Sequence, residues 1–472
     1  MAHSDFLYLQ IADRIEDLIE KETWQIGQRL PSVRRLSQEQ QVSMSTVFQA
    51  YYHLESKGLI EARPKSGYYV TEHPGRERSL PAAKAPDRPL EERTLGELIS
   101  EVYRDLGREE LVSLSVSAPA PSLLPLAKLR KSVQHALSND AGVVYAPLQG
   151  VRSLRQQLAR LAFNWGGVYG EEDIVVTAGC MEALAMCLKA VTVPGDAVAI
   201  ESPTYFGIFQ MLEGLGLKSI EMPTRPESGI DPVALQQTLD RYPSVRACLL
   251  IPNFNNPLGS RMPDDHKRQI VELLARRNVP LIEDDIYGEL YFGKERPRTC
   301  KSFDHNGQVL YCSSLSKSLA PGYRIGWAIP GKWTDKVLEN KFMHTVSTNT
   351  LLQEACAHFL MNGRYALHLR RLRKELHLNY LRYLQAIQEF FPPEVRVSRP
   401  AGGFVLWLEL PPRTDAFVLF RKAKDAGISI APGQLFSKQG AYPNFIRLSF
   451  GAPWDNKIER ALRKLGDLLR SS

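Results

Sequence analysis

Apolar and polar positions along the first 70 residues predict three short helices followed by a hairpin. Apolar side chains recur every three or four residues between positions 6 and 19, and the face opposite them is acidic. Ser32 and Ser43 each precede a further periodic stretch, so we expect them to cap a second and a third helix, the third ending at Gly58. Two strand-like runs then flank the turn-forming residues 63–67. This order is typical of a winged helix-turn-helix.

The pattern changes twice after residue 71. Residues 72–93 are rich in proline and mixed charge and nearly lack large apolar side chains, which predicts a semi-extended linker. From residue 94 onward, apolar runs alternate with helical stretches, the pattern of a mostly parallel sheet covered on both faces. Past Phe342 the chain becomes helical and then gives two more strand-like runs, which predicts a smaller α+β subdomain. We therefore divide the chain into a domain at 1–71, a linker at 72–93 and a larger domain at 94–472.

Charge is distributed unevenly between these segments. The net charge at pH 7 is +7, yet residues 1–75 hold eight Lys and Arg against ten Asp and Glu, a net of −2, which leaves +9 for residues 76–472. Six of the ten acids lie in residues 5–22, mostly within the first predicted helix. DNA binding therefore has to be inferred from where individual cations stand and not from total charge.

Other features exclude several classes of protein. No apolar run approaches the 18 residues of a membrane-spanning helix, and the first residues lack the basic and apolar stretches of a secretory signal. We expect a cytoplasmic protein without a membrane partner. The six cysteines show no Cys-x-x-Cys or Cys/His pairing, so neither a disulfide framework nor a metal site is indicated.

Polar residues gather where the apolar runs of the larger domain end, which is where reactive groups lie in sheets of this kind. After the run VVT, a glycine opens a helix, so the amides of Gly179, Cys180 and Met181 are expected to face an anion. Asp284 ends a later run, and a buried carboxylate needs a positive partner. A protonated pyridine nitrogen is such a partner.

Three further side chains would complete a site for a pyridine ring. Asn256 follows one apolar run and Tyr287 follows another, and both are placed to hydrogen-bond a phenolic oxygen of the ring. Tyr205, in the stretch ESPTYFG, would pack against the ring face. Taken singly, each of these residues also has a structural explanation as a cap, a turn or a core residue.

The stretch from Ser313 to Trp327, SSLSKSLAPGYRIGW, sets a lysine among small residues. The hydroxyls of Ser314 and Ser316 and the guanidinium of Arg324 suit a phosphate dianion. With that anion beside it, the amine of Lys317 is placed to condense with an aldehyde and form a Schiff base. The ordered set of strand-end residues and this lysine favours a cofactor site over separate structural roles.

Over roughly residues 110–472 the chain resembles the fold type I pyridoxal 5′-phosphate enzymes of the aspartate aminotransferase superfamily. The segment YAPLQGVRSLR looks like the family segment whose tyrosine, here Tyr145, reaches the cofactor phosphate of the other subunit. The stretch NFIRLSFG matches the family's carboxylate-binding arginine, here Arg447. Lys317 and Arg324 are seven positions apart, one fewer than in ordinary aminotransferases, so we expect a shortened loop there.

Residues 1–70 resemble the winged helix-turn-helix of GntR regulators, whose signature stands here as LPSVRRL from Leu30 to Leu36. A recognition helix enters the major groove by its N-terminus, and phosphate contacts come from cations beside it and on the wing. The resemblance implies base or phosphate contacts by Ser43, Ser45, Thr46 and Gln49, and contacts to the DNA backbone by Arg34, Arg35, Arg63, Lys65, Ser66 and Gly67.

A GntR-type reader joined to an aminotransferase-like domain is similar to the MocR subfamily of transcriptional regulators. The resemblance implies pyridoxal 5′-phosphate as cofactor, a head-to-tail homodimer and a double-stranded DNA operator. Two functions stay open. One is a regulator that senses an amine or amino acid through a Schiff base at Lys317, and the other is an aminotransferase with a 2-oxo acid acceptor. A module that only binds DNA would leave Lys317, Asp284 and Arg324 without a purpose.

Overall fold

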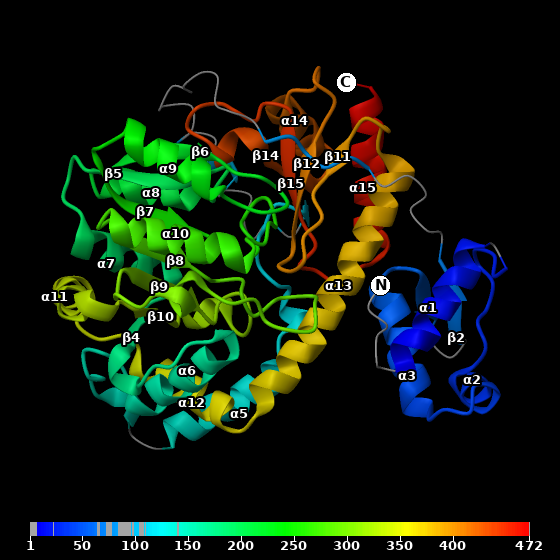
Figure 1. Cartoon of the computed structure of the whole chain (residues 1–472), viewed down its shortest axis with the longest axis horizontal. Helices are drawn as coiled ribbons and strands as arrows, with labels where there is room; N and C mark the ends of the chain where they lie inside the picture. Colours follow the sequence, from blue (N-terminus) through cyan, green and yellow to red (C-terminus); the bar gives the residue numbers. More distant parts are fainter. Residues whose placement is uncertain are drawn as a thin grey trace. The chain divides into compact units, whose positions relative to one another are not determined.

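The computed structural model of the chain describes residues 7–21, 23–63, 67–71, 78–83, 96, 99–102, 108, 110–138 and 141–471. Internal contacts divide the chain into two compact units, Met1–Glu77 and Arg78–Ser472. The first is drawn in dark blue in Figure 1. The predicted boundaries at residues 71 and 93 stay a prediction, because residues 72–77 and 84–95 lie outside the described residues.

The first unit contains the three helices and the hairpin that the sequence predicts. Its elements are α1 (Leu7–Glu20), α2 (Val33–Glu39), α3 (Met44–Ser56), β1 (Ile60–Arg63) and β2 (Gly67–Val70), and β1 pairs antiparallel with β2. Both predicted caps are confirmed, since Ser32 Oγ accepts from the Arg35 amide at 3.2 Å and Ser43 Oγ accepts from the Thr46 amide at 3.1 Å. Apolar side chains from all three helices and both strands form one core.

The second unit is built on a seven-stranded sheet in the order β4-β10-β9-β8-β7-β5-β6. All neighbours are parallel except β10, which runs antiparallel to both β4 and β9. The strands are β4 (Val175–Thr177), β5 (Ala197–Ser202), β6 (Lys218–Pro223), β7 (Val245–Leu250), β8 (Leu281–Asp284), β9 (Val309–Ser314) and β10 (Gly326–Ile329). Five of these strands coincide with predicted apolar runs, whereas β6 and β10 were not predicted.

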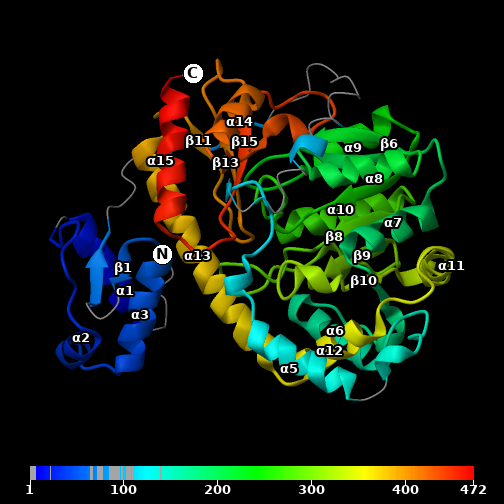
Figure 2. The same ribbon diagram turned by 180° about the vertical axis from the view of Figure 1, so that it is seen from behind.

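Helices cover both faces of this sheet, as Figures 1 and 2 show from opposite sides. Ile200, Leu249 and Ile282 pack toward α7, and their neighbours along the strands pack toward α9 and α10. Two-sided burial explains why the strands read as continuous apolar runs. The helices around the sheet are α5 (Leu126–Leu137), α6 (Arg152–Ala162), α7 (Cys180–Val191), α8 (Phe206–Gly214), α9 (Pro232–Arg241), α10 (Asp264–Arg276), α11 (Thr334–His344) and α12 (Thr350–Met361).

A smaller antiparallel sheet in the order β11-β12-β15-β14 forms the predicted α+β subdomain. Helix α13 (Arg364–Phe390) leads into it, and α14 (Ala416–Asp425) and α15 (Asn456–Arg470) belong to it. Its strands are β11 (Arg396–Val397), β12 (Val405–Glu409), β14 (Ala431–Pro432) and β15 (Phe445–Ser449). Separately, β3 (Val112–Ser113) pairs parallel with β13 (Ile428–Ser429), which carries the chain before α5 to the subdomain.

Residues 78–83, inside the predicted linker, are held against the smaller subdomain. The Arg78 guanidinium donates to the carbonyls of Phe391 and Val395 at 3.0 and 3.1 Å, and the Ala82 amide donates to Glu409 Oε2 at 3.0 Å. Carbonyls at a helix C-terminus lack acceptor roles within the helix, so a cation that binds them is stabilising. This part of the linker is therefore extended but anchored.

Further structural features bear on the excluded classes. No helix among the described residues combines the length and apolarity needed to cross a bilayer. All six cysteines are buried and free of disulfides. Within the described ranges, no three His, Cys, Asp or Glu side chains gather into a candidate metal site.

Candidate functional site

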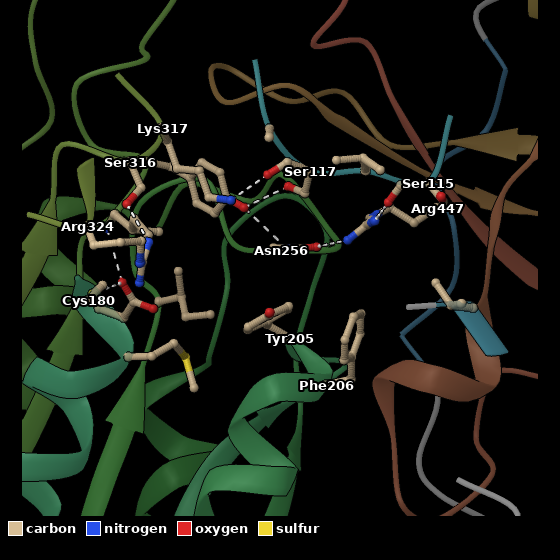
Figure 3. A pocket seen from close by; sticks show the side chains of 18 residues that line it. Ser115, Ser117, Cys180, Tyr205, Phe206, Asn256, Ser316, Lys317, Arg324 and Arg447 are labelled. Carbon is tan, nitrogen blue, oxygen red and sulfur yellow. Dashed lines mark hydrogen bonds between the residues drawn. The ribbon is translucent and has the colours of Figure 1, made fainter. Parts of the chain in front are cut away.

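A cavity of about 290 Å³ lies at the carboxyl ends of the parallel strands. Its walls come from the loops after β5, β7, β8 and β9, from the first turn of α7, from residues 115–118 and from β15. Figure 3 shows Arg324 and Ser316 at one end of it, Arg447 and Ser115 at the other, and Lys317 between them. The cavity therefore has two cationic ends and an amine near its middle.

Three consecutive acids at the end of β8 have three different sets of partners. Glu283 accepts hydrogen bonds from two backbone amides at 2.7 and 2.8 Å. Asp285 forms a buried ion pair with Arg296, with 2.6 Å between Oδ2 and Nη2. Asp284 lies between them and lines the cavity, because successive side chains of a strand point to opposite sides. The structure thus distinguishes two structural acids from one that faces the cavity.

Asp284 has no cation at ion-pair distance among the described residues, although it is buried. Its Oδ1 accepts from the Cys180 thiol at 3.2 Å and from the Ile286 amide at 3.1 Å. Burial raises the pKa of Asp284 to about 6, and these two hydrogen bonds offset part of that rise. A carboxylate in this state favours a positively charged ligand group beside it.

Lys317 follows β9 and is half-buried in the cavity wall, where its Nζ donates to the Ser117 carbonyl. Burial lowers the pKa of Lys317 to about 8, with the Arg447 cation adding to the effect. The amine is therefore half neutral near pH 8, and a neutral amine is the nucleophile that attacks an aldehyde.

The end of the cavity near Arg324 is suited to an anion. Arg324 Nη1 donates to Ser316 Oγ and Nη2 to the Ala178 carbonyl, both at 3.1 Å. Arg324 adopts the left-handed backbone conformation (φ 53°), which is strained for a residue other than glycine and turns its guanidinium back toward the cavity. The first amides of α7, at Cys180 and Met181, have no acceptor within their helix and carry its positive dipole end.

Two glycines allow this end to be packed so tightly. A Cβ on Gly179 (φ +97°) would lie 2.2 Å from Arg324 Nη2. A Cβ on Gly326 would lie 2.4 Å from the carbonyl carbon of Gly179. Only the absence of both side chains lets the turn before α7, strand β10 and the guanidinium meet.

The middle of the cavity contains the side chains predicted to hold a ring. Asn256 Nδ2 donates to the Tyr287 hydroxyl at 3.4 Å, and this hydroxyl also bonds Ser117 Oγ at 2.8 Å. Tyr205 lines the cavity and its ring covers Gly207, where a Cβ would approach the ring to 2.5 Å. The predicted grouping of Asn256, Tyr287 and Tyr205 in one cavity is therefore present.

Arg447 stands on β15 at the far end and is buried. Its Nη1 donates to Asn256 Oδ1 at 3.1 Å and its Nη2 donates to the Ser115 carbonyl. The guanidinium lies 5.3 Å from the centroid of the Phe436 ring. A guanidinium with two donors facing a cavity is the side chain that binds a carboxylate through paired hydrogen bonds.

Not every predicted cofactor residue lines the cavity. Ser314 accepts from the Ser316 amide at 3.1 Å and stands behind it. Tyr145 is 86% exposed and does not line this cavity, which is what a role toward another subunit requires. Sequence reasoning missed Ser115, Ser117 and Phe206, which line the cavity. The serines arrive through the pairing of β3 with β13, and no local motif signals such a distant contact.

In the first unit, the predicted DNA contacts cluster on α2, α3 and the hairpin. Arg34 and Arg35 are exposed, but Arg35 Nε lies 2.6 Å from Glu39 Oε1, so it must leave that acid to reach a phosphate. Ser43 uses its hydroxyl as the cap of α3, while Ser45 and Gln49 are exposed and Thr46 is half-buried.

The hairpin tip is only partly described. Lys65 and Ser66 lie outside the described residues, and of Arg63 the structure describes the backbone at the end of β1. Gly67 has φ +117°, and a Cβ there would lie 3.2 Å from Arg29 Nε. Sequence reasoning missed Arg29, an exposed cation beside the wing whose backbone bridges to Tyr69.

Comparison with known proteins identifies both parts. Residues 109–465 match the family model for aminotransferase class I and II. The chain belongs to this aminotransferase family. Residues 7–70 match the model for bacterial regulatory proteins of the gntR family, so the aminotransferase-like domain is fused to a GntR helix-turn-helix. This is a MocR-like architecture, and the helix-turn-helix implies binding to DNA.

Relatives of this aminotransferase-like regulator fall into two groups. It is 41% identical over 464 residues to the HTH-type transcriptional regulator YjiR of Escherichia coli (strain K12), and the alignment covers 98% of each chain. It is 31% identical over 381 residues to 2-aminoadipate transaminase of Thermus thermophilus, which covers 79% of this chain and 93% of that one. The crystal structure of the α-aminoadipate aminotransferase LysN from T. thermophilus matches with a TM-score of 0.73 and 29% identity, over 80% of this chain and 97% of that one.

Aminotransferases of this class typically depend on pyridoxal 5′-phosphate, and the residues of the cavity fit that group. An amine with a lowered pKa, a buried carboxylate without an ion pair among the described residues, and an anion cradle that two glycines keep open all face one cavity. Each would meet a different part of the cofactor, namely its aldehyde, its pyridine nitrogen and its phosphate.

Proposed function

We propose that this chain is a transcriptional regulator that holds pyridoxal 5′-phosphate at Lys317 and senses an amine or an amino acid there. The observation that carries the proposal is that Lys317 and Arg447 face the same cavity as Asp284. The cofactor, when bound, supplies an aldehyde that forms a Schiff base with a primary amine, with loss of water. A ligand amine then competes with Lys317 for that aldehyde, and Arg447 selects ligands that carry a carboxylate.

The other side chains of the cavity would orient the cofactor. Asp284 would pair with the ring nitrogen, which explains a buried carboxylate that has no ion pair with any described residue. Asn256 and Tyr287 would hydrogen-bond the ring oxygen, and Tyr205 would cover the ring face. Ser316, Arg324 and the first amides of α7 would bind the phosphate.

The helix-turn-helix would read a double-stranded operator through the N-terminus of α3. Exposed Ser45 and Gln49 are available to base edges, and exposed Arg34 is available to a phosphate. For a ligand in the cavity to change DNA affinity, it must favour one conformation of the protein over another. A regulator that acts on DNA in this way would work in the cytoplasm.

A homodimer would complete the site. Val143, Val144 and Tyr145 are 87%, 61% and 86% exposed, which is unusual for three consecutive large apolar residues. They lie beside the start of α12, where Thr350 Oγ1 donates to the Val144 carbonyl at 2.8 Å. A second subunit packed head-to-tail on this strip would bury it and bring Tyr145 toward the partner's phosphate cradle.

A second candidate function is an aminotransferase that passes the amino group of an amino acid to a 2-oxo acid. It is favoured by the similarity to 2-aminoadipate transaminase and by the lowered pKa of Lys317, about 8. A lysine with this pKa can take a proton from the substrate carbon and return it to the cofactor carbon near neutral pH. The cavity thus contains the groups that both candidate functions need.

An absorption titration separates the two candidates. Purified protein is loaded with pyridoxal 5′-phosphate, amino acids and amines are added singly, and spectra are recorded with and without a 2-oxo acid. A sensor gives a band that shifts with one compound and stays shifted, without keto product. An aminotransferase converts the cofactor to its amine form, and the 2-oxo acid restores the first band.

Two lysine variants provide the control. Lys317→Ala should lose the band of the lysine-bound cofactor. Lys341→Ala should keep it, although Lys341 is also buried and has its pKa lowered to about 8 by burial, because Lys341 does not line this cavity. Wild-type protein that shows no such band at saturating cofactor would refute the proposal.

A further inference from the structure

Two helices of the second unit carry cations that form no ion pair with another described residue. Helix α5 holds Lys128, Arg130 and Lys131 and no Asp or Glu over its whole length. Helix α13 holds five cations before its first acid, Glu375, and the first three of them are Arg364, Arg370 and Arg371. Four of these six cations are exposed and two are half-buried. We call these six residues the basic surface.

The two sets of cations lie close to each other. Helix α12 packs against both α5 and α13, and Figures 1 and 2 show α5 and α12 beside the first turns of α13. Lys128 from α5 and Arg371 from α13 are both near enough to the imidazole of His368 for their positive charges to affect its pKa. Burial lowers the pKa of His368, and these two like charges lower it further.

No ion pair relieves this concentration of charge among the described residues. None of the six cations contacts an Asp or Glu within 4 Å there, whereas cations elsewhere on the unit often do, as Arg277 does with Asp240 at 2.5 Å. Like charges held together without acids destabilise one another, so the surface is favoured by an anionic partner. The six residues do not line the cofactor cavity.

We propose that the basic surface binds the phosphate backbone of duplex DNA, in addition to the contacts of the helix-turn-helix. The proposal rests on the proposed function only in that DNA is the polyanion that this chain meets. Residues 1–75 have a net charge of −2, and the +9 of the chain lies in residues 76–472. Phosphate contacts supply most of the salt-dependent affinity of DNA-binding proteins. Total charge alone does not locate DNA contacts, but the six cations of the basic surface form no ion pair among the described residues and are available to phosphates.

The test measures binding of the full-length protein to a long duplex of random sequence at 50 and 200 mM salt. Two double variants remove adjacent cations of the basic surface, Arg130→Gln with Lys131→Gln, and Arg370→Gln with Arg371→Gln. The matched control, Arg276→Gln with Arg277→Gln, removes two adjacent exposed cations, the last residue and the C-cap of α10, a helix that also contains three acids. All variants should keep the absorption band of the bound cofactor, which shows that they fold.

The salt slope is the steepness with which log affinity falls as log salt concentration rises, and each lost phosphate contact lowers it by about 0.9. Each basic-surface variant should therefore lower it by about 1.8, so that the ratio of wild-type to variant affinity falls about twelve-fold between 50 and 200 mM salt. The control should retain the wild-type slope. Unchanged slopes in the basic-surface variants, or equal losses in the control, would overturn the proposal.

Two further measurements show which of the two proposals a negative result contradicts. Arg34→Ala with Arg35→Ala tests the helix-turn-helix alone, so loss of binding there with unchanged basic-surface variants removes this inference and leaves the proposed function standing. If instead the Arg34 and Arg35 variant binds normally and the basic-surface variants lose binding, the contacts assigned to the helix-turn-helix are wrong and the role of the basic surface stands. If the basic-surface variants bind DNA normally but lose affinity for polyglutamate, the surface serves an acidic protein and the proposal is wrong.

Discussion

Replacing Asp284 with asparagine should stabilise the cofactor-free protein and weaken its binding of the cofactor. Asp284 is buried among groups that do not balance its charge, and burial raises its pKa to about 6. Asparagine keeps the shape and an oxygen that can accept from the Ile286 amide. It removes the charge that the protein alone does not stabilise and that a pyridinium nitrogen would.

The size of the effect follows from the pKa. The pKa rises from 3.8 in the unfolded chain to about 6 in the folded one, and one unit corresponds to about 1.4 kcal/mol. Because the folded state holds the proton more tightly, stability is highest below pH 3.8 and is lost as the pH rises through 6. The gain from Asp284→Asn should be under about 1 kcal/mol at pH 4 and about 3 kcal/mol at pH 7.5.

The assay is urea unfolding of the cofactor-free wild type and variant at both pH values, with a cofactor titration of each protein. Asp285→Asn is the control, since it removes the charge of one of the two carboxylates that pair with the buried Arg296, at 2.6 Å, and leaves only Glu289 at 2.7 Å; it should destabilise by about 1.5 to 3 kcal/mol, the strength of a hydrogen bond between charged groups. A variant whose stability relative to wild type is the same at pH 4 and pH 7.5 would show that buried charge at Asp284 does not destabilise the protein. Cofactor affinity unchanged in Asp284→Asn would refute its assigned role.

Three further results are expected. Arg447→Ala should weaken the binding of amino acids about 10- to 100-fold, because it removes hydrogen bonds between charged groups. In the same spectral titration, matched amines without a carboxylate should keep their affinity. An equal loss of affinity for both would contradict the assignment of Arg447. The rate at which cofactor-free protein captures pyridoxal 5′-phosphate should rise with pH with a midpoint near 8, the pKa of Lys317, and a midpoint near 10.5 would mean that burial does not tune the amine. Ser43→Ala should destabilise the helix-turn-helix by about 1 kcal/mol through loss of the α3 cap, seen as a lower thermal midpoint by circular dichroism with the cofactor band intact.

Much of the fold was predictable because its determinants are local or periodic. The caps at Ser32 and Ser43 depend on the next three residues, and strands buried on both faces appear as uninterrupted apolar runs. Strand β6 was missed because it is an edge strand with several exposed positions. Strand β10 was missed because it begins at Gly326, inside the stretch that was interpreted as the lysine motif.

The cofactor side of the site was also predictable, since carboxyl ends of parallel strands converge at one edge of a sheet. The remainder depends on contacts between distant residues. Ser115 and Ser117 enter the cavity because Val112 and Ser113 pair with residues more than 300 positions later. From the sequence, the cavity role is assigned to Asp284, but only the position of Arg296 shows that the neighbouring Asp285 is structural.

The carbonyls of Ser115 and Ser117 have a consequence for how strongly any ligand binds. One accepts from Arg447 and the other from Lys317, so two of the three basic side chains of the cavity already have acceptors on a single short segment. A ligand carboxylate gains only the difference between its own hydrogen bonds and those it replaces. These backbone carbonyls therefore compete with a ligand for the same hydrogen-bond donors, and they are always present because they belong to the chain. If the chain senses a ligand as proposed, the backbone of residues 115–117 would set the ligand level at which it responds, independently of the side chains that recognise the ligand.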